Sequence, residues 1–174
     1  MGKPAVGTHT YALDTGGSRL RYQLTILSVG ANESEYRITR EGTKQVSYIT
    51  YAAQSDGLYQ VGSGYRGVVV SSCKQSPPVP LYYWHVRLHQ AWRVASACRQ
   101  ATGNSETQEY RYEVSNVASK GSQRYIVVVE HSATVGASGD ACVRTYRFDT
   151  AHGLLLDEVA DCPGIHQHRW LVTT

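Results

Sequence analysis

Residues 19–26 read Arg-Leu-Arg-Tyr-Gln-Leu-Thr-Ile, and this stretch decides the fold class. Its apolar and aromatic side chains, Leu20, Tyr22, Leu24 and Ile26, alternate with polar ones. Successive side chains of a β-strand point to opposite faces of the sheet. This period of two therefore predicts a strand with one buried face and one face in water.

The same period recurs along most of the chain. Further strands are predicted at residues 35–40, 45–52, 58–61, 65–71, 109–117, 124–130, 143–149, 154–159 and 168–173. Turn-forming residues separate strands at 15–18, 30–32, 41–43, 55–57, 119–122, 136–140 and 151–153. The sequence therefore predicts an all-β, single-domain protein over residues 1–174, in which about ten short strands form an antiparallel meander. We expect a strongly curved open sheet or an incomplete barrel.

One proline-rich segment interrupts this rhythm. Residues 76–80 read Ser-Pro-Pro-Val-Pro, and each proline fixes its own φ and disfavours helix at the preceding residue. We expect an extended crossing at 76–80 that divides the domain into two half-sheets. The next stretch, 81–99, fits both a helical face and an alternating strand, and its β-branched and aromatic content favours extended structure.

Composition and charge exclude several classes of protein. The chain has 174 residues, of which 41% are hydrophobic and 18% charged, a balance typical of a globular domain. Seventeen basic and fourteen acidic residues give a net charge of +3, spread along the chain, so no nucleic-acid partner is expected. The longest aliphatic run, 126–129, is four residues, so no membrane span is expected.

The aromatic residues are thirteen Tyr and three Trp against one Phe. Tyr combines an apolar ring with a hydroxyl that needs a hydrogen-bond partner, so it suits a sheet face that is half buried and half wet. We expect the concave face to hold an apolar or amphipathic ligand, with arginines at the rim for an anionic head group. The residues expected to line it are Tyr22, Tyr36, Tyr48, Tyr51, Trp92 and Tyr112. An equally weighted alternative is that these rings fill the core.

The cysteines indicate the compartment. Cys73, Cys98, Cys142 and Cys162 are even in number, and none forms a Cys-x-x-Cys pair. Two structural disulfides explain them better than four buried free thiols. Three pairings exist, and Cys73 with Cys98 and Cys142 with Cys162 is favoured because each pair spans one return from strand to strand. We therefore predict an extracytoplasmic protein that is secreted, periplasmic or lipid-anchored at the cell surface.

The first four residues, Met-Gly-Lys-Pro, do not form a signal segment. We expect that a signal or lipid-anchor segment was removed and an artificial start added. The alternative is a native cytosolic start.

Motifs for catalysis and metal binding are weak. Residues 62–67 match the dinucleotide-binding pattern Gly-x-Gly-x-x-Gly, but valines typical of a strand follow where a helix is required, so a flexible hairpin is favoured. Two histidine pairs, His166 with His168 and His85 with His89, have spacings that suit a metal. Apart from the nearby Asp157, Glu158 and Asp161, no Cys, Asp or Glu is placed to complete either set, so paired surface histidines are favoured and neither a metal nor a cofactor is predicted. The weakest alternative is a hydrolase or metal site at His152, with Asp149 and Asp157 as acidic partners.

A series of motifs resembles uncharacterised β-sheet proteins of the bacterial cell envelope. The motifs, over about residues 56–160, are Asp56-Gly57-Leu58-Tyr59, Pro78-Val79-Pro80-Leu81, Trp92, Lys120-Gly121-Ser122-Gln123-Arg124-Tyr125, Tyr146-Arg147-Phe148 and His152-Gly153-Leu154-Leu155. Those proteins are similar in fold to the periplasmic carriers and outer-membrane receptors of lipoproteins, whose curved antiparallel sheet cups acyl chains. The resemblance implies a lipid or another apolar small molecule as ligand, and it supplies no catalytic residue.

The expected function is therefore that of a non-enzymatic extracytoplasmic binding module of the bacterial envelope. The alternative is a structural or protein-interaction domain without a small-molecule ligand, which binds an envelope protein through an exposed edge strand.

Overall fold

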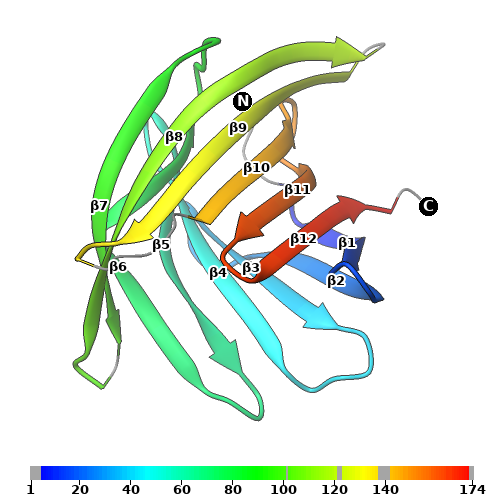
Figure 1. The fold of residues 1–174 in the computed structure, drawn as a ribbon, viewed down its shortest axis with the longest axis vertical. Helices are drawn as coiled ribbons and strands as arrows, with labels where there is room; N and C mark the ends of the chain where they lie inside the picture. The colour runs from blue at the N-terminus through cyan, green and yellow to red at the C-terminus, as the bar shows by residue number, and fades with distance from the viewer. Residues whose placement is uncertain (1–4, 101, 121–122, 137–141, 173–174) are drawn as a thin grey trace.

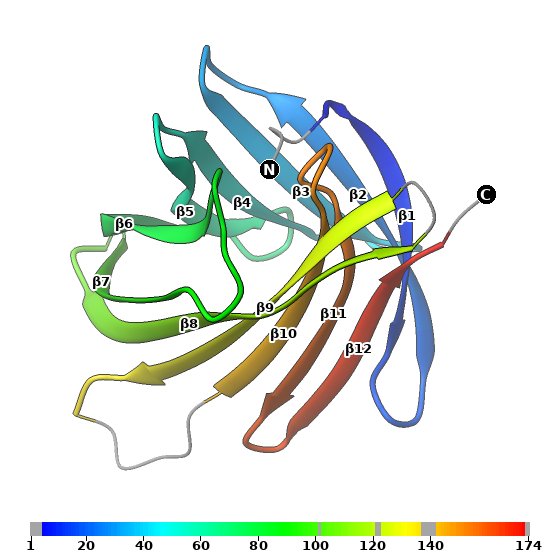
Figure 2. The same ribbon diagram turned by 90° about the horizontal axis from the view of Figure 1, so that it is seen from above.

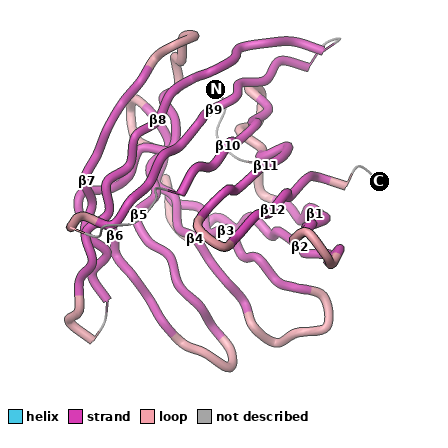
Figure 3. The backbone as a smooth tube through the Cα atoms, viewed as in Figure 1, coloured by secondary structure: helices cyan, strands magenta, loops and turns pink. Residues whose placement is uncertain are grey.

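The computed structural model describes residues 5–100, 102–120, 123–136 and 142–172. These residues form strands and the turns between them, and Figure 3 shows no helix among them. No helix long and apolar enough to cross a membrane is therefore present in this part of the chain. The expected artificial start, residues 1–4, lies outside the described residues.

Twelve strands follow one another along the described part of the chain, two more than the alternation pattern predicts. They are β1 (Gly7–Asp14), β2 (Arg19–Ser28), β3 (Glu33–Arg40), β4 (Val46–Ala53), β5 (Gly57–Arg66), β6 (Ser71–Tyr83), β7 (Ala91–Gln100), β8 (Ser105–Lys120), β9 (Gln123–Thr134), β10 (Cys142–Asp149), β11 (Leu155–Cys162) and β12 (Ile165–Leu171).

The strands form a closed antiparallel barrel, so the prediction of an all-β meander is confirmed, and the prediction of an open sheet or incomplete barrel is wrong. Each strand pairs with the next along the chain, and residues 11–14 of β1 pair with residues 168–171 of β12. Figures 1 and 2 show the strands following one another around the ring until β12 lies beside β1. Closure is favoured because it pairs the backbone groups of the two strands that would otherwise be sheet edges.

Three local differences from the predicted strands have simple causes. Strand β1 was not predicted because its inner positions include Gly7 and His9, which carry no apolar signal. Residues 65–71, expected to be a strand, contain the hairpin turn between β5 and β6. The ambiguous stretch 81–99 is extended at both ends, in β6 and β7, with a connection between them.

The proline-rich segment 76–80 lies inside β6, where Val79 and Pro80 pair with β5, so it is part of a strand in one continuous sheet and not a crossing between two half-sheets. It interrupts the ladders on both sides, and the register with β5 shifts between Gln60 and Gly62. Residues 73–76 of β6 pair with residues 97–100 of β7, and the ladder goes no further. Proline has no N–H to donate to a ladder, and the carbonyl of Pro77 instead accepts a hydrogen bond from the Ser96 hydroxyl at 2.6 Å.

The two shortest ladders of the barrel are thus β6 with β7 and β1 with β12. They divide the ring into a first leaf, β1–β6, and a second leaf, β7–β12. Both leaves turn their buried side chains into the barrel, where they form one core. The largest fully buried side chains of this core include Tyr11, Ile26, Leu58, Tyr82, Ile126 and Val128.

Both expected disulfides are present, Cys73–Cys98 and Cys142–Cys162, and the described residues contain no free cysteine. The first joins β6 to β7, and the second joins β10 to β11. In an up-and-down barrel alternate turns lie at the same end, which places both disulfides and the turns 41–45 and 67–70 at one end. We call this the disulfide end. Two disulfides indicate an oxidising environment.

Candidate functional site

Four polar side chains of neighbouring strands β9 and β10 lie inside the barrel near the disulfide end. They are Glu130, Ser132, Arg144 and Tyr146, and we call this group the charged mouth. Glu130 lies directly opposite Arg144 in the ladder. Side chains alternate between the two faces of a strand, so residues two apart share a face. Ile126 and Val128 on β9 and Phe148 on β10 are buried in the core. The four polar side chains lie at even steps from these residues and therefore also face the interior.

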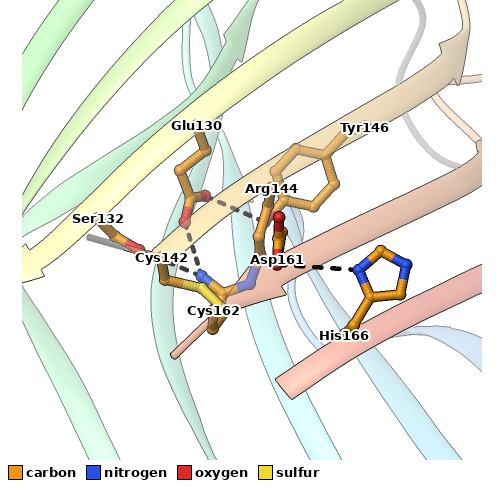
Figure 4. Close-up of a disulfide and its surroundings, with 8 residues drawn as sticks. All are labelled: Glu130, Ser132, Cys142, Arg144, Tyr146, Asp161, Cys162 and His166. Atoms are coloured by element: carbon orange, nitrogen blue, oxygen red, sulfur yellow. Dashed lines mark hydrogen bonds and ion pairs between the residues drawn. A yellow bond between two sulfur atoms is a disulfide. The ribbon is translucent and has the colours of Figure 1, made fainter. Parts of the chain in front are cut away.

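Hydrogen bonds connect every member of the charged mouth (Figure 4). Arg144 Nη1 donates to Glu130 Oε1 at 2.9 Å and to the Ser132 hydroxyl at 3.2 Å. The Tyr146 hydroxyl donates to the other oxygen, Glu130 Oε2, at 3.0 Å. Both oxygens of this carboxylate are therefore bonded, as a carboxylate inside a barrel requires.

Burial differs across the charged mouth. The Glu130 side chain is 5% exposed, whereas that of Arg144 is 33% exposed. Figure 4 shows the Cys142–Cys162 disulfide beside Arg144. The buried carboxylate thus lies on the inside, and the guanidinium that neutralises it is the member of the pair that reaches solvent.

Burial also determines the protonation of the neighbouring tyrosines. Burial raises the pKa of Tyr146 well above its usual value, and the charge of Glu130 raises it further. The same two causes act in the same order on the pKa of Tyr112. Burial raises the pKa of Tyr110 to about 12. At neutral pH these hydroxyls are therefore hydrogen-bond donors and not bases.

A second interior ion pair continues the polar lining on β11 and β12. Arg169 Nη1 lies 3.2 Å from Glu158 Oε2, and the Arg169 Nε is buried with no hydrogen-bond partner in the part of the chain that the structure describes. Tyr11, Tyr22 and Arg169 help to line a small interior gap of about 10 Å³, which is about the size of one water.

Two of the six residues predicted to bind ligand lie beside the charged mouth. Cross-strand pairing places Trp92, Tyr112, Glu130 and Arg144 in one row of the inner face. The Trp92 and Tyr112 rings stack with centroids 5.2 Å apart, and the Trp92 indole N–H donates to the carbonyl of Pro80 at 3.0 Å.

The other four predicted residues lie apart from this row. Tyr36 and Tyr51 are buried in the first leaf, with ring centroids 4.7 Å apart, and Tyr22 lines the small gap. Tyr48 lies on the outer face, where the guanidinium of Arg66 lies 4.2 Å from its ring centroid. The structure therefore does not bring the six aromatics together on one face.

The outer face around Tyr48 has its own ion cluster. Glu35 accepts a bidentate pair of hydrogen bonds from Arg66, both at 2.7 Å, and a third from Arg37 at 2.6 Å. The hydrogen bonds from Arg66 are the largest cause of the lowered pKa of Glu35. The ring of Tyr48 also leaves no room for a side chain at position 64, where a Cβ would lie 2.6 Å from the Tyr48 hydroxyl oxygen. Residues 62–67 are thus glycine-rich for packing, and 62–66 belong to strand β5.

The alternative site at His152 is assembled in part. His152 Nδ1 lies 2.7 Å from Asp149 Oδ2 at the turn between β10 and β11. Asp157 is not a member of this pair, because it forms an ion pair with Arg147. Asp149 Oδ1 also accepts the Ala151 N–H at 3.1 Å, so the carboxylate holds the turn. Among the residues that the structure describes, no three His, Cys, Asp or Glu side chains form a group able to hold a metal.

A shallow depression of about 500 Å³ lies on the second leaf. It is lined by Ala91, Trp92, Arg93, Arg111, Tyr112, Glu113 and His131. Strand alternation puts the side chains of Arg93, Arg111 and His131 on the outer face, opposite in direction to those of Trp92 and Tyr112. The depression is therefore a feature of the outer surface.

Sequence reasoning missed Glu130 and Arg144. A signal was present: Glu130 follows Ile126 and Val128 at steps of two, so a charge occupies a position in an inward-facing apolar series. A charged residue in such a series indicates a buried partner of opposite charge.

Comparison with protein-family models, with curated protein sequences and with solved structures finds no significant match. The choice of site therefore depends on its geometry.

Proposed function

We propose that the protein is a non-enzymatic binding module of the bacterial envelope, and that the charged mouth holds the anionic group of an amphipathic ligand. The main support for this proposal is the position of Arg144. Its hydrogen bonds to Glu130 and Ser132 both use Nη1 and so leave Nη2 and Nε for a ligand, and its side chain is one-third exposed. A guanidinium presents paired donors that match a carboxylate or phosphate.

The surroundings of Arg144 support an amphipathic ligand. Tyr65 and Ile165 occupy inner-face positions at the disulfide end and are 48% and 50% exposed. Trp92 and Tyr112 extend the same inner row as Arg144. An anionic group at Arg144 would thus have aromatic side chains in its own inner row, and apolar side chains at the same end of the barrel, to cover a short apolar tail.

Thermal unfolding of the oxidised protein tests the proposal with three probes: decyl phosphate, decanol and inorganic phosphate. We expect decyl phosphate to raise Tm more than either fragment, because it engages both Arg144 and the apolar rim. Arg144→Gln abolishes this shift, and Arg144→Lys, which keeps the charge but loses the paired donors, retains part of it.

The matched control is Arg93→Gln, since Arg93 is paired with a glutamate on the outer face. It should leave the decyl phosphate shift unchanged. No shift in the unaltered protein, or the same shift with Arg144→Gln, overturns the proposal.

A second candidate function is protein interaction through the outer depression, favoured by its size and its exposed Arg93 and Arg111. Native mass spectrometry before and after organic extraction separates the two functions. A mass that leaves on extraction supports the ligand carrier. A bare mass four protons below that of the reduced chain, as two disulfides require, favours the interaction module.

A further inference from the structure

We propose that the disulfide end docks on an anionic lipid surface through the turn between β5 and β6. This inference concerns a different surface from the charged mouth and does not rest on the proposed function. Three consecutive valines form the tip of the turn: Val68, Val69 and Val70 are 85%, 59% and 79% exposed. Single exposed apolar residues are common, but a consecutive exposed run marks an interaction site.

The turn is fastened so that these valines point outward. Gln45, from the neighbouring turn between β3 and β4, binds the backbone of Val69 twice: Nε2 donates to the carbonyl at 3.1 Å, and Oε1 accepts the N–H at 3.0 Å. Figure 1 shows these two hairpins side by side at the lower edge of the barrel.

Gly67 allows this close contact between the hairpins. Its φ is +118°, and a Cβ at this position would lie 2.5 Å from the carbonyl oxygen of Lys44. The backbone of the turn is thus bonded to the protein, while its side chains have no apolar cover. A held apolar tip loses little conformational entropy when it enters an apolar phase.

Basic side chains flank the tip. Lys44 adjoins Gln45, and Lys74 lies four residues beyond Val70 on β6. Lys74 is directly opposite Arg99 of β7 in the ladder, and both are exposed. Within the described residues none of these three cations has an ion pair.

Like charges directly opposite each other destabilise a sheet. A nearby anion attracts both charges and offsets this repulsion. An apolar tip between basic side chains fits the interface of an anionic bilayer: the valines enter the acyl boundary, and the cations contact the head groups. Lys74 and Arg99 thus point to an anionic surface, and the valines point to one with an apolar layer beneath.

Vesicle flotation tests this inference with the oxidised full chain. The probes are vesicles of phosphatidylcholine alone and of phosphatidylcholine with one-third phosphatidylglycerol. We expect binding to the anionic vesicles and at least about tenfold weaker binding to the neutral ones. The triple variant Val68→Ser, Val69→Ser, Val70→Ser should weaken anionic-vesicle binding by at least about tenfold. Lys74→Gln with Arg99→Gln should weaken it by about fivefold for each charge.

Matched controls come from the opposite end of the barrel. Val29, Leu88 and Val117 are also exposed, at 49%, 52% and 39%, and their triple serine variant should bind as the unaltered protein does. Arg87→Gln with Arg124→Gln is the corresponding charge control. Because all these side chains are exposed, each variant should keep the Tm of the parent.

Absence of binding to anionic vesicles overturns the inference, as does binding that survives the Val68–Val70 substitutions. A valine-dependent dimer in analytical ultracentrifugation, without vesicle binding, would assign the tip to a second copy of the chain and overturn the lipid assignment as well.

Discussion

The two leaves of the barrel bury different chemistry on the same inner surface. The first leaf buries tyrosines: Tyr36 and Tyr82 are at least nine-tenths buried, and their hydroxyls have no hydrogen-bond partner among the described residues. The second leaf buries a carboxylate, Glu130, but supplies both of its oxygens with donors from Arg144 and Tyr146.

This difference indicates which interactions stabilise each leaf. A buried hydroxyl without a partner costs about 1–3 kcal/mol, so the first leaf is stable through ring packing and despite its hydroxyls. Removal of one partner of a buried ion pair leaves the other charge buried without compensation, which is strongly destabilising. The stability of the second leaf therefore depends on each member of the charged mouth. The two leaves should therefore respond in opposite ways to the loss of a polar atom.

The largest expected effect is alkaline unfolding, in which both leaves take part. Burial is the largest cause of a raised pKa at eight tyrosines: Tyr11, Tyr36, Tyr51, Tyr59, Tyr82, Tyr110, Tyr112 and Tyr146. Below pH 10 these groups are protonated in both states, and the stability is complete. Above pH 10 only the unfolded chain ionises, so each of the seven buried tyrosines costs on the order of 1 kcal/mol per pH unit. Tyr59 costs less, because its hydroxyl is bonded to Asp56 near the surface, where solvent screens the charge.

Absorbance at 295 nm, followed together with circular dichroism, measures this effect. We expect these tyrosines to ionise in one step that coincides with loss of β-structure. Ionisation of all thirteen near pH 10 in a folded barrel would contradict it.

The next effect separates the leaves. Arg144→Met leaves the Glu130 carboxylate buried without its cation and should lower the free energy of unfolding by about 3 kcal/mol in urea. Adding Glu130→Gln should restore most of this loss, because no charge then remains to be paired. The outer pair Arg93 with Glu109 provides the control: Arg93→Met should cost at most about 1 kcal/mol. Equal costs for both arginines would remove the distinction between inner and outer pairs.

The disulfides close loops of similar length, with sequence separations of 25 and 20. The chain-entropy argument gives about 3 kcal/mol for the loss of either pair to alanine. Their positions differ, because Cys73–Cys98 bridges the two leaves and Cys142–Cys162 lies within the second. Amide hydrogen exchange should therefore become faster along β6 and β7 in the Cys73 and Cys98 variant alone. Faster exchange at those strands in both variants would argue against two separate leaves.

The smallest effect is also the sharpest test of the comparison. Tyr146→Phe removes a donor to Glu130 and should cost about 1 kcal/mol. Tyr36→Phe removes a hydroxyl that has no partner and should be neutral or stabilising by up to about 1 kcal/mol. Urea unfolding of both variants measures the two changes. A loss of stability in both would mean that the Tyr36 hydroxyl has a partner in solution.

Local sequence patterns predicted the local features of this fold. Alternation identified most strands, and the pairing Cys73 with Cys98 followed from their places on either side of one return. Closure could not be predicted in this way. It depends on residues 11–14 meeting residues 168–171, and no local pattern records how far a sheet has curved over the strands between them.

The candidate site shows the same limit. Tyr48 and Tyr51 are an odd number of positions apart in one strand, so alternation alone requires them to face opposite sides, as they do. Both were nevertheless predicted to line one face. Glu130 and Arg144 were missed because their pairing depends on the register between β9 and β10, which alternation within a single strand does not record.

The ladder between β1 and β12 also determines the order in which the chain assembles. Every other ladder of the described strands joins neighbours along the chain, so each hairpin brings together residues that are close in sequence. Contacts of short sequence separation form fast, and distant ones have a larger loop-closure entropy to overcome. The hairpins should thus form first, with the meeting of the first and last strands as the slow final event, and until then a nascent chain carries two open strand edges.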